Sequence, residues 1–237
     1  MAIWRRRRRH LLPGALATLV FVLLAGSVEA AGYPPLAALL IAIAVVIIPF
    51  ELGVVFIAGR GEPGLLSAIP YRDRMAARDW VILVPVLVVA GILGFGLLGV
   101  AEQPIRDTLF EWLPDWYLNP LPTDEIGRYS GTAWTTTLGA YLILNVLAGP
   151  MVEELYFRGY LLPRMGQFGR WAALVNVVLF SLYHFWSPWQ LLSRIAGVTP
   201  FAYAVWWKRN MYLGAVVHVL LNGIGTVALI VFVMNQL

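Results

Sequence analysis

The 237-residue sequence contains no cysteine and few charged residues. The absence of cysteine excludes disulfide bonds, thiolate metal ligands, a cysteine nucleophile and palmitoylation. Charged residues make up 13% of the chain, whereas soluble domains carry about 25%, and hydrophobic residues make up 60%. This composition predicts an all-α fold in the form of a polytopic bundle of membrane-spanning helices.

Seven stretches of the sequence are long and apolar enough to cross a bilayer, which needs about 20 mostly apolar residues. They are 11–31, 33–57, 80–101, 137–162, 171–188, 190–207 and 211–235. We therefore expect three parts. Residues 1–101 hold a basic segment and three transmembrane helices, residues 102–130 form an extracytoplasmic loop, and residues 131–237 form a core of four transmembrane helices.

The charge distribution predicts the orientation of these spans. Arg5 to Arg9 form a basic block before the first span, and basic residues mark the cytoplasmic side. The loop over 102–130 carries six acidic residues and two basic ones, as expected for the opposite side. The net charge of +4 follows from this pattern and does not indicate a nucleic-acid partner. A short chain without a targeting extension favours a prokaryotic inner membrane, with the N-terminus cytoplasmic.

Ionisable residues inside membrane spans are costly and are functional candidates. The C-terminal spans contain Glu153, Glu154, Arg158, His184, Arg194 and His218, together with the amides Asn145, Asn176 and Asn222. Glu51 stands alone in the N-terminal spans, and we expect it to pair with a polar group of the C-terminal spans. Arg194 lies near the outer end of its span, so we expect its side chain to snorkel toward the interface.

Polar residues of three separate spans fall at a similar depth. Counting about 1.5 Å per helical residue from the cytoplasmic ends, Glu153, His184, His218 and Asn222 lie roughly 13–20 Å deep. His218 and Asn222 are four residues apart and share a helix face. The sequence therefore predicts that these four side chains meet inside the bundle.

The two adjacent glutamates are expected to have different neighbours. Glu154 and Arg158 lie one turn apart on the same helix face, which predicts an ion pair. Glu153 points about 100° away from Glu154 and is left to face a cavity. Pro150 lacks a backbone N–H and is expected to kink this helix or to begin its second half.

This combination of groups indicates hydrolysis of an amide bond by an activated water. A glutamate beside an imidazole can act as a general base. A second histidine with an amide one turn away offers donors to a developing oxyanion. Other intramembrane protease designs fit the sequence less well, because it has no HExxH, GxGD or GxSG motif.

Three motifs occur in order on separate expected spans. They are Glu153-Glu154-x-x-x-Arg158, Phe180-x-x-x-His184 and His218-x-x-x-Asn222. Together they resemble the motifs of the CPBP family, the CAAX proteases and bacteriocin-processing (Abi) enzymes, over about 140–225. The resemblance implies a glutamate-dependent intramembrane endopeptidase. Many relatives are described with eight spans, so a count of eight stays open.

The resemblance also implies a role for each motif residue. Glu153 with His184 would activate the water, and His218 and Asn222 would form the oxyanion site. The supporting residues would be Glu154 and Arg158 within the first motif and Phe180 beside His184.

No cofactor is expected from this resemblance, although a divalent metal such as zinc is an alternative. Glu153, His184 and His218 would then be the ligands, because a glutamate with two histidines matches a 2-His-1-carboxylate set. The implied partners are the lipid bilayer and a membrane-associated protein or peptide substrate.

Two other classes of function stay open at this point. Intramembrane Glu, His and Arg residues also serve proton-coupled transporters, but the two halves of this chain show no repeat of the kind that transporters usually contain. An inactive membrane scaffold or immunity protein could keep the same residues.

Overall fold

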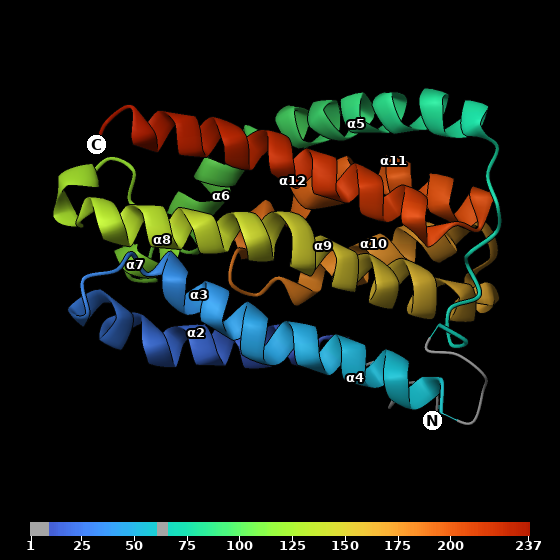
Figure 1. Cartoon of the computed structure of the whole chain (residues 1–237), viewed down its shortest axis with the longest axis horizontal. Helices are drawn as coiled ribbons and strands as arrows, with labels where there is room; N and C mark the ends of the chain where they lie inside the picture. Colours follow the sequence, from blue (N-terminus) through green and yellow to red (C-terminus); the bar gives the residue numbers. More distant parts are fainter. Residues whose placement is uncertain (1–9, 61–65) are drawn as a thin grey trace.

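The computed structural model describes residues 10–60 and 66–237. The basic block Arg5–Arg9, on which the expected orientation depends, lies outside these residues. Within the two described ranges the chain is built from helices and contains no β-strand. Figure 1 shows these helices running side by side along the long axis of the molecule, so the predicted all-α bundle is confirmed.

Five helical runs in the described residues are long and apolar enough to cross a membrane. They are α2 (Leu12–Ala30), Leu36–Ala58, α5 (Ala77–Gly99), Gly131–Arg164 and α12 (Met211–Met234). The second run consists of α3 (Leu36–Ala42), the π-helical η2 (Ile43–Ile47) and α4 (Ile48–Ala58). The fourth consists of α8 (Gly131–Tyr141), the π-helical η4 (Leu142–Ala148), α9 (Gly149–Glu153), the π-helical η5 (Glu154–Leu161) and the short η6 (Leu162–Arg164).

The expected span at 171–188 is longer than the helix that the structure contains, whereas the expected helix at 190–207 is present as α11 (Leu191–Lys208). After η7 (Gly166–Trp171), helix α10 (Ala172–Tyr183) has 12 residues and a length of about 18 Å. This is shorter than the hydrocarbon core, which is about 30 Å thick. A turn containing η8 (Pro188–Gln190) leads into α11 (Leu191–Lys208), which is not among the five runs either. The predicted extent of 171–188 is therefore wrong, and a count of seven spans is not confirmed.

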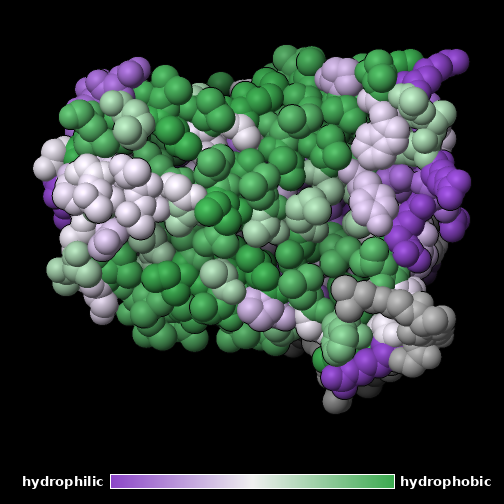
Figure 2. All heavy atoms as spheres, viewed as in Figure 1, coloured by the Kyte–Doolittle hydropathy of each residue, from purple (hydrophilic) through white to green (hydrophobic). Residues whose placement is uncertain are grey.

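A broad apolar band crosses one face of the bundle between two more hydrophilic ends. Figure 2 shows hydrophobic side chains across the middle of this face and hydrophilic ones near the two ends. Individual side chains on the outer helices are strongly exposed, among them Leu23, Val81 and Leu97 at 68–74%. Exposed apolar surface of this kind is what a lipid bilayer covers.

The segment that was expected to form an extracytoplasmic loop folds onto the bundle. It contains α6 (Glu102–Leu109), α7 (Asp115–Leu118) and η3 (Ile126–Arg128). The hydroxyl of Tyr117 donates a hydrogen bond of 2.8 Å to the carbonyl of Phe185 in the turn before α11. Burial raises the pKa of Tyr117 to about 12, so this hydroxyl keeps its proton at neutral pH. The contact fixes the position of the turn.

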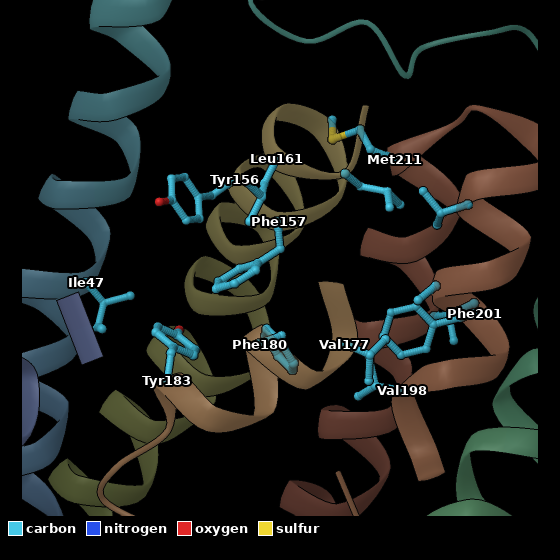
Figure 3. Close-up of a cluster of buried hydrophobic side chains, with 14 of the residues drawn as sticks. Ile47, Tyr156, Phe157, Leu161, Val177, Phe180, Tyr183, Val198, Phe201 and Met211 are labelled. Carbon is cyan, nitrogen blue, oxygen red and sulfur yellow. The ribbon is translucent and has the colours of Figure 1, made fainter. Parts of the chain in front are cut away.

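The hydrophobic core joins the two halves of the chain. Ile47 from the N-terminal helices belongs to the same buried cluster as Tyr156, Phe180 and Phe201 from the C-terminal helices (Figure 3). Buried packing is continuous between the N-terminal helices and the C-terminal helices. The division into an N-terminal part and a protease core therefore stays a prediction.

Helices α5 and α11 pack closely because glycine lies at their contact. A Cβ atom on Gly94 would lie 2.6 Å from the carbonyl oxygen of Ala196. Small residues allow such close approach between helices in membranes, where packing replaces the hydrophobic effect as the driving force. Helix α5 thereby holds α11, which carries one wall of the site.

We predict that Gly94→Ala destabilises the protein by about 1–3 kcal/mol, because the added methyl group overlaps a backbone carbonyl that cannot move freely. Thermal unfolding of the purified protein in detergent is the measurement. Gly96→Ala is the matched control on the same helix, because no atom lies within 4 Å of its would-be Cβ. Equal unfolding temperatures for the two variants would contradict the expected packing.

Candidate functional site

Glu153 lies beside two histidines at the edge of a cavity of about 360 Å³. Its Oε1 atom is 3.7 Å from Nε2 of His184, and its Oε2 atom is 3.9 Å from Nε2 of His218. Asn222 lines the same cavity. The structure thus brings together the four residues that the depth argument places at one level, from α9, the end of α10, and α12.

The helix that carries Glu153 is irregular on both sides of it. The π-helical η4 ends at Ala148, and Pro150 lies in the first turn of α9, as expected of a proline that starts a new helical segment. The π-helical η5 begins directly after Glu153. Such π segments are rare and often occur at functional sites. These π segments set the direction in which the side chain of Glu153 points from the helix.

Two asparagines bond to carbonyl groups of these π-helical segments. Nδ2 of Asn222 donates to the carbonyl of Asn145 at 2.8 Å, and Nδ2 of Asn176 donates to the carbonyl of Phe157 at 2.9 Å. Polar side chains from neighbouring helices can satisfy backbone groups that an irregular membrane helix frees. Asn222 is therefore fixed in position, with a second N–H that is not used in this bond.

The predicted ion pair between Glu154 and Arg158 is confirmed, and both side chains are fully buried. Nη1 of Arg158 lies 3.0 Å from Oε1 of Glu154. The guanidinium carbon lies 4.3 Å from the ring centre of Phe180 and 5.3 Å from that of Phe201. Aromatic faces attract a desolvated cation and so reduce the cost of burying it.

Glu154 has a second partner that the sequence did not indicate. Nδ1 of His218 lies 3.1 Å from Oε1 of Glu154, the same oxygen that contacts Arg158. A carboxylate is an acceptor, so this contact places a proton on Nδ1 and turns Nε2 toward the cavity. Glu154 itself is not among the residues lining the cavity. Glu154 therefore orients His218 from the side of the ring that faces away from the cavity.

Gly214 makes room for this arrangement on α12. A Cβ atom at this position would lie 2.5 Å from Oε2 of Glu154. Gly214 lies one helical turn before His218, and this spacing was the only sign in the sequence that another side chain packs against α12 here. The structure identifies that side chain as Glu154.

Tyr183 is a further residue that sequence reasoning missed. Its hydroxyl donates a hydrogen bond to Oε1 of Glu153, and its side chain is fully buried. The signal was its place directly before His184 and three residues after Phe180, on the inner side of α10. It holds one oxygen of Glu153 and leaves the other toward His218.

His184 is oriented by its own helix. Its Nδ1 lies 2.7 Å from the carbonyl of Phe180, which can only accept, so Nδ1 carries the proton. Nε2 then presents a lone pair on the side of Glu153 when the ring is neutral. The ring centre of Phe180 is 4.8 Å from that of His184, so Phe180 packs beside His184 as expected.

Glu51 does not form the expected pair. Its side chain is fully buried in α4, and neither carboxylate oxygen has a hydrogen-bond partner in the described part of the chain. A metal held by Glu153, His184 and His218 stays the alternative to a metal-free site. Among residues 10–60 and 66–237, no group of three or more His, Asp or Glu side chains is arranged to hold a metal ion.

Comparison with known proteins identifies one segment of the chain. Residues 135–224 match a family model described as Type II CAAX prenyl endopeptidase Rce1-like. Comparison with curated proteins and with solved structures gives no match.

The matched segment contains all three motifs and every residue that meets at the cavity from α9, α10 and α12. This is a protease family, and together with the apolar helices the match identifies an integral membrane protein with support for peptidase activity. The predicted resemblance to the CPBP family of CAAX proteases is thereby confirmed over residues 135–224.

Proposed function

We propose that this protein is an intramembrane endopeptidase of the glutamic type, which hydrolyses a peptide bond of a membrane-associated protein or peptide. The observation that carries the proposal is the position of Glu153, with His184 and His218 on its two sides and a cavity in front of it. No covalent nucleophile is needed, because water attacks the carbonyl carbon directly.

Glu153 and His184 activate the water in this proposal. The water donates one hydrogen to Glu153 and the other to the lone pair on Nε2 of His184. Glu153 takes the first proton as the water oxygen bonds to the carbonyl carbon, and later passes it to the leaving amine nitrogen as the C–N bond breaks. Tyr183 holds the carboxylate in the orientation that this transfer requires.

His218 and Asn222 stabilise the oxyanion that forms on the carbonyl oxygen. His218 already has a proton on Nδ1, so donation from Nε2 to the oxyanion requires the imidazolium form. The second N–H of Asn222 supplies the other donor. Preorganised donors of this kind are worth about 3–4 kcal/mol of transition-state stabilisation each.

We expect Glu153→Gln to lower peptide-bond cleavage by at least about 100-fold, because the amide cannot take the proton from water. Membrane-protein termini are compared by proteomics in cells that carry wild type or the variant. The control is Glu111→Gln, which makes the same change at an exposed residue outside the cavity. If all three proteins yield identical termini, the peptidase proposal is wrong and a scaffold role is favoured.

The role of Glu154 in holding His218 can be tested without replacing a polar residue. Gly214→Ala should reduce cleavage by about tenfold or more, because the methyl group displaces the Glu154 carboxylate from His218. Gly225→Ala on the same helix meets no atom within 4 Å and should keep full activity. Cleavage rates are compared after thermal unfolding has verified that both variants fold. Full activity of Gly214→Ala would refute this role of Glu154.

We also propose that the reaction needs no metal ion, since Glu153 takes the proton from water and returns it to the leaving amine, while the two imidazoles supply hydrogen bonds. Purified enzyme is therefore expected to keep its activity after dialysis against EDTA or dipicolinic acid. A loss of activity that zinc restores would instead identify Glu153, His184 and His218 as metal ligands.

A further inference from the structure

Glu51 is a buried acidic side chain that takes no part in the proposed reaction. It is fully buried in α4, and neither carboxyl oxygen has a hydrogen-bond partner in the described part of the chain. A carboxyl group that leaves water without gaining other hydrogen bonds is costly to bury. Buried polar groups are almost always bonded to protein or to ordered water. Glu51 therefore indicates a bound ligand that supplies these hydrogen bonds.

Glu51 lies one helical turn behind the wall of the cavity. Ile47, Glu51 and Val55 follow one another at a spacing of four residues and form the buried face of this helical run. Ile47 lines the cavity together with Tyr183 (Figure 3), whereas Glu51 is not part of the lining. Helix α4 packs against α9 and η5. Glu51 therefore faces the helical run that carries Glu153 from outside the cavity.

The groups with which Glu51 interacts electrostatically are those of the site. The strongest of these interactions is with Glu153, followed by those with Arg158 and Glu154. Tyr183 also interacts with Glu51 in this way. No ion pair or direct hydrogen bond joins Glu51 to them among the described residues. Where polar groups are close but beyond hydrogen-bond distance, a water molecule can bridge them.

The two buried arginines of the site are not partners of Glu51. Nη1 of Arg158 contacts Glu154 at 3.0 Å, and aromatic rings cover the guanidinium. Arg194 is only 8% exposed, so it does not snorkel as expected. Its Nη2 atom donates to two neutral side chains, both at 2.8 Å. A neutral ligand between Glu51 and the site therefore fits better than a direct ion pair.

Tyr183 offers a second attachment point for such a ligand. Its hydroxyl donates to Oε1 of Glu153, which leaves the lone pairs of the phenolic oxygen able to accept a hydrogen bond. A water molecule can donate one hydrogen to Glu51 and the other to this oxygen. Hydrogen bonds in a chain strengthen one another, so a hydroxyl that accepts from water donates more strongly to its own acceptor.

We propose that Glu51 binds an internal water molecule, and that this water links Glu51 to the hydrogen bond between Tyr183 and Glu153. Buried waters of this kind make about three hydrogen bonds to polar groups that would otherwise lack partners. The catalytic consequence rests on the proposed function, whereas the water site does not. Glu51 is a positioning residue, because it acts on Glu153 through the water and Tyr183 and does not touch the substrate.

A structure that resolves ordered water tests the site itself. Crystals of the full-length protein grown in a lipidic mesophase should show solvent density within about 3.2 Å of a Glu51 oxygen and of the Tyr183 hydroxyl. Glu51→Gln should keep this density, because an amide also bonds to water, and Glu51→Met should lose it. No density at Glu51 in a wild-type map that resolves other ordered waters would overturn the proposal.

Stability and cleavage together test the positioning role. Replacing a buried acid by an apolar side chain of similar size is often neutral or stabilising. Glu51→Met should therefore unfold in detergent at a temperature no lower than that of wild type. Its cleavage of the membrane-protein termini that depend on Glu153 should fall by about tenfold, because the carboxylate is less well held. Glu51→Gln should recover part of this loss.

Ile57→Met is the matched control, because it places the same side chain at an exposed position of α4. It should change neither the unfolding temperature nor cleavage. If Glu51→Met lowers both quantities, Glu51 is a packing residue and the positioning role is refuted. Wild-type cleavage by Glu51→Met would refute that role as well.

The outcome is separate from that for the proposed function. Ordered water at Glu51 in a protein whose Glu153→Gln variant leaves all termini unchanged would refute the peptidase and retain the water site. Cleavage that depends on Glu153, in a wild-type protein without water at Glu51, would refute the present inference alone.

Discussion

The buried contact of Glu154 with Arg158 and His218 is the interaction on which the arrangement of the site depends. One carboxylate oxygen faces a guanidinium at 3.0 Å and an imidazole at 3.1 Å, and so connects η5 to α12. Removing one partner of such a buried pair typically costs about 3–5 kcal/mol, because the other charge is left without compensation. Phe180 and Phe201 cover the guanidinium and exclude water from it.

The unexpected shortness of α10 and the geometry of the site have the same origin. Because α10 ends at Tyr183, the turn after it lies against α6 and α7, where Tyr117 and Glu102 hold it and the start of α11. His184 is the first residue beyond the helix, and Arg194 lies in the opening turns of the next one. A helix that continued to residue 188 would carry His184 inside a regular span instead.

The N-terminal helices contribute apolar walls to the cavity. Leu36, Leu39, Ile43 and Ile47 line the cavity from α3 and η2, and Phe95 lines it from α5. None of these residues belongs to the three motifs. An apolar wall can be built from many different side chains. The family match covers 135–224, whereas the cavity draws on both halves of the chain.

The sequence by itself determined the membrane bundle, the pairing of Glu154 with Arg158 and the meeting of Glu153, His184, His218 and Asn222. These follow from hydropathy, helical spacing and depth, which are local or additive properties of the chain. Only the tertiary structure decided the contact of Glu154 with His218, the contact of Tyr183 with Glu153, and the burial of Arg194. Each depends on how helices distant in sequence rotate and end against one another, and helical periodicity does not specify either.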